Sequence, residues 1–154
     1  MQIRMIIKKA SASDFDSIRQ LNERLLSHES RYDPYLKPAD DDYDRWLSKK
    51  LRDDNTLFVV AKDSGKVIGY QLSWLENRLY MNGMIGYLCE GFVDENHRRQ
   101  GICRKMLEET MKWFKDKGVS VIEADINSGN EISIDFLKSR GFFEKSKRMR
   151  VEIQ

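Results

Sequence analysis

Cysteine, histidine and proline are scarce in this sequence of 154 residues, which has two of each. The two cysteines, Cys89 and Cys103, are too few for a disulfide framework, and the histidines His28 and His97 lie far from them, so no zinc-site spacing is present. Free thiols in a chain without a secretory signal favour a reducing compartment. We therefore expect a cytoplasmic protein that binds no metal.

Long hydrophobic runs and an excess of charge are also missing. No run approaches the roughly 18 apolar residues of a membrane span, and the apolar part of MQIRMIIKKA is too short for a signal peptide. The 27 Lys and Arg residues nearly balance the 25 Asp and Glu residues, giving a formal net charge of +2. This balance, without a base-stacking motif, argues against nucleic acid and membrane partners, although a basic run lies near the C-terminus (Lys138, Arg140, Lys145, Lys147, Arg148 and Arg150).

What the sequence does contain fits one globular domain over residues 1–154. Hydrophobic residues make up 40% of the chain and charged residues 34%, and a chain of this length buries roughly 70% of its surface on folding. Hydrophobic periodicity predicts strands over residues 3–8, 57–61, 67–74, 84–93, 119–126 and 142–153, with helices near 13–25, 43–51, 101–118 and 131–140. This β-α-α-β-β-β-α-β-α-β order predicts a mixed α/β fold with one parallel strand pair in an otherwise antiparallel sheet.

A basic turn joins the strand ending at Phe92 and Val93 to the helix that starts near Gly101. The first amides of a helix lack intrahelical acceptors and attract anions, and glycine lets a phosphate approach the backbone. Four cations, which suit a pyrophosphate and a further phosphate, surround this point: Arg98, Arg99, Arg104 and Lys105. Neither GxxxxGK[ST] nor GxGxxG is present. The turn is therefore expected to bind a polyphosphate, unless its arginines only face water.

The six residues Arg98-Arg-Gln-Gly-Ile-Cys103 resemble the loop [QR]-x-x-G-x-[GA] of the GNAT superfamily of N-acetyltransferases, which use acetyl-CoA. The helix after Asn130, which ends in Arg140-Gly-Phe142, is similar to the family motif N-x-x-A-I-x-x-Y-x-x-x-G-F. This resemblance implies a GNAT acyltransferase fold, with a parallel strand pair splayed at the cofactor site and helices on both faces of the sheet. It also implies acetyl-CoA, leaving as coenzyme A, as co-substrate, bound by Phe92, Val93, Arg98, Arg99, Gln100, Gly101, Ile102, Cys103, Arg104, Asn130, Ser133 and Phe136. For Asn130 a helix N-cap, and for Phe136 a place in the core, remain open.

Three positions depart from the family pattern. Cys103 replaces Gly or Ala, where we expect it to pack, and Ser133 replaces Ala. Leu137 replaces the tyrosine that protonates the leaving thiolate in the family. A thiol pKa near 8.5 makes the thiolate a tolerable leaving group, so a slower enzyme, or one that recruits Tyr87 or Ser139, is expected. The alternative is an acetyl-CoA-binding module with little or no turnover.

The resemblance implies direct attack of an amine on the thioester in a ternary complex. Because a primary amine has a pKa of about 10.4, a base must remove its proton. Glu90 and Asp125 are the predicted catalytic carboxylates; the position of Asp125 resembles that of a catalytic acid residue in some ribosomal-protein acetyltransferases of the superfamily. Glu123 comes third, and for each of them pairing with an arginine is the alternative.

The acceptor side is expected near an acidic, aromatic loop, which holds Asp33, Asp40, Asp41, Asp42 and Asp44 with Tyr32, Tyr35 and Tyr43. Such a loop attracts cations by charge and by cation–π contact; alternatively it is solvated, with Asp42 capping the second helix. The expected acceptor is a small cationic amine, or a lysine or N-terminal amine of a protein. The resemblance also implies a homodimer formed through the late strands.

Overall fold

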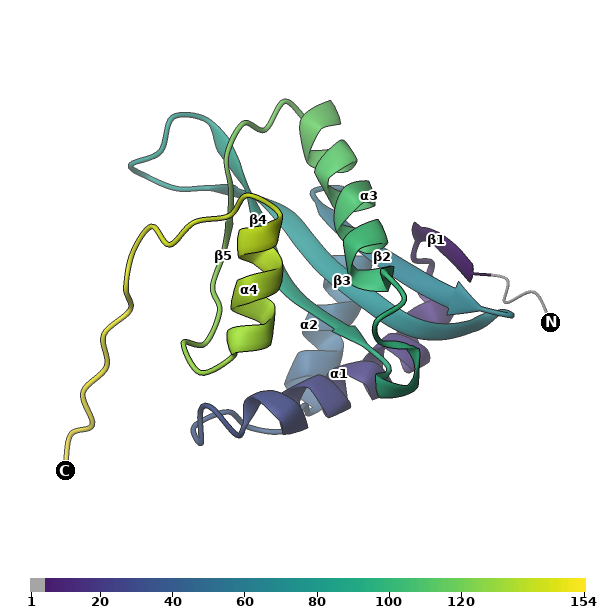
Figure 1. The fold of residues 1–154 in the computed structure, drawn as a ribbon, viewed down its shortest axis with the longest axis horizontal. Helices are drawn as coiled ribbons and strands as arrows, with labels where there is room; N and C mark the ends of the chain where they lie inside the picture. Colours follow the sequence, from purple (N-terminus) through teal and green to yellow (C-terminus); the bar gives the residue numbers. More distant parts are fainter. Residues whose placement is uncertain (1–4) are drawn as a thin grey trace.

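The computed structural model describes residues 5–154 as one five-stranded sheet with helices on both faces (Figure 1). The strands follow one another in chain order: β1 (Met5–Lys9), β2 (Thr56–Asp63), β3 (Lys66–Asn77), β4 (Met84–Val93) and β5 (Ile122–Ala124). The first four pair antiparallel, and β4 pairs with β5 in parallel. The predicted mixed α/β class and its parallel pair are confirmed. Residues 3–4 of the first predicted strand lie outside the described residues.

The helices divide between the two faces of the sheet. On one face lie α1 (Phe15–Glu29), which follows the 3₁₀ turn η1 (Ala12–Asp14), and α2 (Asp41–Leu51); on the other lie α3 (Ile102–Asp116) and α4 (Glu131–Ser139). Side chains alternate along a strand, so Phe58 and Val60 of β2 pack in the α1/α2 core while Val59 packs in the α3 core. None of the helices in this part of the chain is long and apolar enough to cross a bilayer.

A bulge in the β3–β4 pair decides which side chains of β4 share a face. Leu72 opposes Glu90, but its neighbour Ser73 opposes Leu88, so Cys89 is the extra residue. A bulge of this kind shifts the alternation by one residue. Tyr87 and Glu90, three residues apart, therefore both face α1 and α2 instead of opposite sides of the sheet.

The parallel strands β4 and β5 separate soon after they meet. Residues 86–88 of β4 pair with residues 122–124 of β5, and β4 then continues to Val93 with no strand on that side in the described chain. The basic turn, whose first part is the 3₁₀ turn η2 (Glu95–His97), starts where the strands have parted. The predicted splay of the parallel pair is confirmed.

Two expectations about the last strands were wrong in extent or kind. The strand expected over 119–126 is limited to 122–124. The strand expected over 142–153 does not form: this C-terminal segment leaves α4 without regular structure (Figure 1). Its apolar side chains at Phe143, Met149, Val151 and Ile153 are 80–93% exposed. Alternating hydrophobicity predicts strand character, but a strand also needs a neighbouring edge to pair with, which is a tertiary property.

Candidate active site

Gly101 forms the turn into α3. Its φ of 72° lies in the left-handed region, which costs an L-residue roughly 1–2 kcal/mol. As N-cap it offers no side-chain acceptor, and the first turn of α3 has no acidic residue. The first amides of α3 therefore have no side-chain acceptor and are available to bind an anion from solution. Gln100 and Arg104 are exposed beside them.

Two arginines flank the aromatic ring at the end of β4. The Arg98 guanidinium lies 5.4 Å from the centroid of the Phe92 ring, and its Nε donates to the Val93 carbonyl at 3.3 Å. Arg24 of α1 lies 5.3 Å from the same centroid and pairs with Asp94 at 3.2 Å. Arg24 could not be predicted from the sequence, because a cation on the polar face of an amphipathic helix has no distinguishing signal.

Several of the predicted cofactor-binding residues have side chains that pack inside the protein. Phe92, Val93 and Ile102 are buried in the hydrophobic cores, so only their backbone groups are available to a ligand. Cys103 has exposed surface, yet the atoms packed around its sulfur raise the pKa of the thiol. Cys103 is therefore not an activated nucleophile.

Asn130 is the N-cap of α4, one of the two roles left open for it. Its side-chain oxygen accepts from the Ser133 amide at 3.2 Å, and its Nδ2 donates to Glu29 at 3.1 Å. Phe136 packs against the core cluster of Leu88, Leu107 and Phe114. Asn130 and Phe136 therefore hold α4 in place, and Ser133 is half-buried at its first turn.

Glu90 is the centre of a largely buried polar network on the α1/α2 side. Its Oε1 accepts hydrogen bonds from Tyr43 Oη at 2.8 Å, Tyr70 Oη at 3.1 Å and Asn22 Nδ2 at 3.2 Å. Burial raises the pKa of Glu90, although these three donors act in the opposite direction. All three bonds end on Oε1, so Oε2 is left without a hydrogen-bond donor among the described residues.

Among the partners of Glu90, Tyr43 was expected near the acceptor, but Asn22 and Tyr70 were not predicted from the sequence. Asn22 is fully buried on the apolar face of α1, four residues after Ile18 and three before Leu25, with its own Oδ1 unpaired. A polar residue within an apolar helical stripe was the available signal. Tyr70 gave no comparable signal, because buried tyrosines are common in cores.

Asp125 and Glu123 lie on the same face of the sheet but differ in their contacts. Tyr87 Oη donates to Asp125 at 2.8 Å, and the Asp125 side chain is 56% exposed. Burial would raise the pKa of Glu123, but hydrogen bonds from Lys145 and Arg78 outweigh it and lower that pKa. Glu123 is therefore an ion-paired carboxylate, which was the alternative expected for it.

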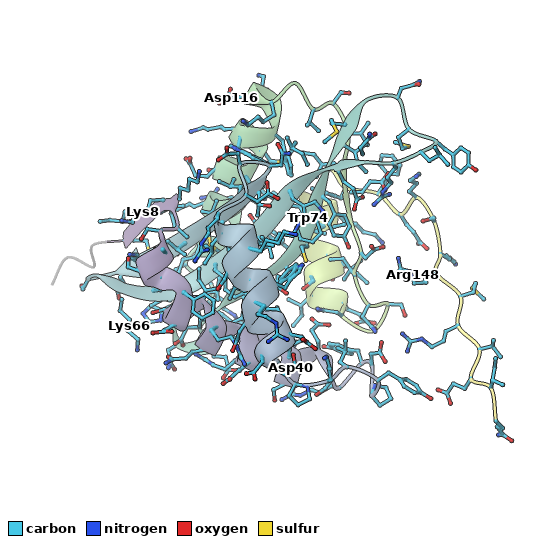
Figure 2. The ribbon with its side chains drawn as sticks, turned by 180° about the vertical axis from the view of Figure 1, so that it is seen from behind. Lys8, Asp40, Lys66, Trp74, Asp116 and Arg148 are labelled. Carbon is cyan, nitrogen blue, oxygen red and sulfur yellow. The ribbon has the colours of Figure 1, made fainter. Side chains whose placement is uncertain are left out.

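A row of aromatic rings connects α2 to the edge of β4. The centroid distances are 5.4 Å for Tyr43–Trp46, 6.1 Å for Trp46–Trp74 and 5.2 Å for Trp74–Tyr87. Lys50 Nζ lies 4.2 Å from the Trp74 centroid, a cation–π contact. Figure 2 shows Trp74 beside α2, so the row extends from the Glu90 network toward Asp125.

The acidic loop is largely neutralised by the protein's own cations. Asp40, and not Asp42, caps α2 by accepting from the Tyr43 amide at 3.1 Å, and Asp40 also pairs with Lys37. Asp33 binds Arg150 through both oxygens at 2.8 Å, which lowers the pKa of Asp33 to about 2. Asp42 and Asp44 pair with Arg45 and Arg19. The capping assignment of Asp42 was wrong.

Both proposed stand-ins for the family tyrosine have hydrogen-bond acceptors within the protein. The Tyr87 hydroxyl donates to Asp125, and the Ser139 hydroxyl donates to the Phe136 carbonyl at 2.5 Å. Burial, followed by the bond to Asp125, raises the pKa of Tyr87, making it a weaker acid. Leu137 itself packs against the core beside α3. Over residues 5–154, no group of three His, Cys, Asp or Glu side chains is arranged to hold a metal ion.

Comparison with known proteins agrees with this geometry. The model of the acetyltransferase (GNAT) family matches residues 18–142. A curated relative, an uncharacterized N-acetyltransferase of Methanocaldococcus jannaschii, is 25% identical over 142 residues, which cover 90% of this chain. Those residues span 61% of that relative's length.

Two solved structures share the fold. The BH1408 protein of Bacillus halodurans, solved as a tetramutant, has a TM-score of 0.84 at 20% identity, with 96% of this chain and 99% of that chain covered. The aminoglycoside N-acetyltransferase AAC(6')-Iy, solved with CoA, has a TM-score of 0.78 at 18% identity, with 100% and 97% covered. The family match covers most of the chain and includes both the splayed strands and the turn at Gly101. The chain belongs to the GNAT family of acetyltransferases.

Proposed function

We propose that this protein transfers the acetyl group of acetyl-CoA to a primary amine, with Glu90 as the base that receives the amine proton. One observation carries the proposal: Glu90 is a half-buried carboxylate with a raised pKa and an Oε2 free of hydrogen-bond donors among the described residues. It lies on β4, the strand that parts from β5 and leads into the basic turn.

The residues around Gly101 fit the pyrophosphate of the co-substrate. The uncapped start of α3 offers amide donors, the first turn of α3 contains no acidic residue, and Arg98 and Arg99 supply positive charge beside it. When bound, acetyl-CoA supplies the thioester carbonyl that the amine attacks. The backbone amide of Val93, beyond the point where β5 ends, is the proposed donor to the oxygen of that carbonyl, because the Asp94 amide donates to Ile68 of β3 and successive amides of a strand point to opposite edges.

Glu90 is a better base than Asp125 for two reasons. A raised pKa increases proton affinity, and the optimum for a general base lies near the working pH. The Tyr43, Tyr70 and Asn22 side chains also fix the Glu90 carboxylate in one orientation. Asp125 is exposed and hydrogen-bonded to Tyr87, so its proposed role is to attract the charged acceptor.

The leaving thiolate departs without a side-chain acid in this proposal. Leu137 has no proton to give, and the hydroxyls of Tyr87 and Ser139 are committed within the protein. Because coenzyme A has an ordinary thiol pKa, about 8.5 by analogy with cysteine, its thiolate can leave and take a proton from water. We expect turnover to continue at a reduced rate, since a general acid contributes roughly 10²–10⁴-fold.

The proposed acceptor is a small cationic amine. The aromatic row from Tyr43 to Tyr87 and the carboxylates of Glu90 and Asp125 face the same side of the sheet and suit a polar cation. The name of AAC(6')-Iy assigns it an aminoglycoside, an acceptor of this kind. A protein lysine or N-terminal amine is the other candidate acceptor.

The test is release of free thiol from acetyl-CoA, measured with a panel of aminoglycosides, polyamines and lysine-containing peptides. We expect release that depends on a cationic small amine and falls at least 100-fold in Glu90→Gln. Glu109→Gln, at an exposed position of α3 whose carboxylate pairs only with Lys112, is the matched control of unchanged rate. Thiol release with peptides alone would mean that the acceptor is a protein amine instead of a small cationic amine. Binding of acetyl-CoA without thiol release would favour the alternative of an acetyl-CoA-binding module with little or no turnover, which the replacement of the family tyrosine by Leu137 suggests.

A further inference from the structure

Lys50 of α2 places its ammonium group at the centre of the aromatic row that runs from Tyr43 to Tyr87. Lys50 Nζ lies 4.2 Å from the Trp74 ring centroid and 5.9 Å from the Trp46 ring centroid. An ammonium group within about 6 Å of a ring centroid is attracted by the negative face of the ring. The two tryptophan rings therefore already hold one cation, which belongs to the protein itself.

Lys50 differs from the other cations beside the row because no carboxylate neutralises it. Arg19 and Arg78, which lie beside the two end rings, both form ion pairs with carboxylates of this chain. Among residues 5–154, no carboxylate oxygen lies within 4.0 Å of Lys50 Nζ. The side chain is half-buried between α2 and the sheet. Its positive charge is therefore not cancelled by a neighbouring group.

Lys50 acts on the same face of the sheet as Glu90. Leu72 of β3 opposes Glu90, and Trp74 follows two residues later on the same face. Two residues of a strand span about 7 Å. Both charges also act on the Cys89 thiol: burial raises its pKa, the Glu90 charge raises it further, and the Lys50 charge opposes the rise. Charges in physiological salt are screened over about 8 Å, so an acceptor whose amine contacts Glu90 has its remaining atoms within range of the Lys50 charge.

We propose that Lys50 sets the charge selectivity of the acceptor site: the acceptor is a monoamine, whose reacting group is its one positive charge, and a second ammonium group near Trp74 is excluded. This inference rests on the proposed acetyl transfer with Glu90 as the base. A second ammonium group would meet Lys50 at ring faces that are already occupied, and like charges at close range repel each other. An uncharged chain would instead bury apolar surface against the tryptophan rings.

The Asp125 carboxylate, beside the end ring of Tyr87, is the competing attraction for a second cation. It already accepts from Tyr87 at 2.8 Å and pairs with Arg148 at 3.7 Å. A second ammonium group would therefore have to displace an arginine to reach Asp125, and it would still pass the Lys50 charge. The proposal thus narrows the class of small cationic amines to monoamines. Polyamines and aminoglycosides, which carry several ammonium groups, are the poorer acceptors.

Two acceptors of equal chain length test this selectivity by thiol release from acetyl-CoA. Hexylamine carries one ammonium group, and hexamethylenediamine carries a second one at the far end of the same chain. We expect kcat/KM of the native protein to be at least tenfold higher with hexylamine. Lys50→Met removes the charge but keeps an apolar side chain against the rings, so this ratio should fall at least fivefold, mainly through a lower KM for the diamine. Lys50→Arg keeps the charge and should keep the ratio.

Lys49→Met is the matched control, because it removes the same charge from the exposed neighbouring position of α2 and should leave the ratio unchanged. A native kcat/KM that is equal or higher with the diamine would overturn the proposal. Equal changes of the ratio in Lys50→Met and Lys49→Met would also overturn it, since net charge alone would then explain them. Failure of the proposed function looks different: acetyl-CoA binds, but neither amine releases thiol from the native protein or from Lys50→Met, and the present inference falls with it.

Discussion

Glu90→Gln removes the charge of the proposed base and keeps an oxygen that can accept the hydrogen bonds of Tyr43 and Tyr70. Loss of a general base lowers rates by roughly 10²–10⁴-fold, which corresponds to about 3–5 kcal/mol of activation free energy. Because the pKa of Glu90 is raised, the low-pH limb of kcat/KM should lie above the ordinary glutamate value of about 4.3. In Glu90→Gln, the fall of kcat/KM at low pH that comes from protonation of Glu90 should be absent.

The same raised pKa affects stability in the opposite sense. A carboxyl group whose pKa is higher in the folded than in the unfolded state stabilises the fold below the unfolded pKa, and this contribution is lost as the pH rises through the folded pKa. Ionised Glu90 therefore costs about 1.4 kcal/mol for each unit of the rise. As the pH rises from the ordinary glutamate pKa of about 4.3 through the raised folded pKa, Glu90→Gln should gain unfolding free energy relative to the native sequence. No further gain should appear once Glu90 is ionised in both states.

The assay combines thiol-release kinetics from pH 5 to 9 with urea unfolding of both proteins at the same pH values. The reasoning is refuted if kcat/KM falls less than threefold in Glu90→Gln, because the carboxylate then receives no proton in the rate-limiting step. A stability difference that does not vary with pH would show that burial of Glu90 has no charge penalty.

Three other substitutions probe separate parts of the site. Gly101→Val forces a β-branched residue to a φ of 72°, so we expect at least tenfold weaker acetyl-CoA binding by calorimetry and about 1–2 kcal/mol lower stability. Asn130→Ala removes the N-cap of α4 and should cost about 1 kcal/mol in thermal unfolding, with acetyl-CoA affinity unchanged; a large loss of affinity would give Asn130 a direct cofactor role. Leu137→Tyr supplies a phenol at the family position and should raise kcat by up to about 100-fold at pH 7; an unchanged kcat alongside intact acetyl-CoA binding would show that departure of the thiolate does not limit turnover.

The strand and helix pattern was predictable where local signals were strong. The αL glycines at 101, 118 and 141 and the apolar faces of α1 and α3 follow from turn chemistry and helical spacing. Residues 142–153 show the limit of such signals: alternation predicts a strand, but this segment pairs with no strand of the described chain.

The site divides in a similar way. The turn at Gly101 was predictable because a helix start and its cations are adjacent in sequence. The surroundings of Glu90 were not, since Asn22, Tyr43 and Tyr70 come from three elements and meet it only in the folded sheet. The bulge at Cys89, which brings Tyr87 and Glu90 to one face, depends on the register of β3 against β4 and has no signature in β4 alone.

The most direct test of the central claim is a calorimetric titration of acetyl-CoA into the protein, followed by addition of a cationic amine and measurement of free thiol in the same sample. The account predicts one acetyl-CoA bound per chain, weaker binding in Arg98→Ala and in Arg99→Ala, and thiol release only after the amine is added. Absence of binding, or an affinity unchanged in both arginine variants, would contradict the assignment of the turn from Arg98 to Arg104 as the acetyl-CoA site.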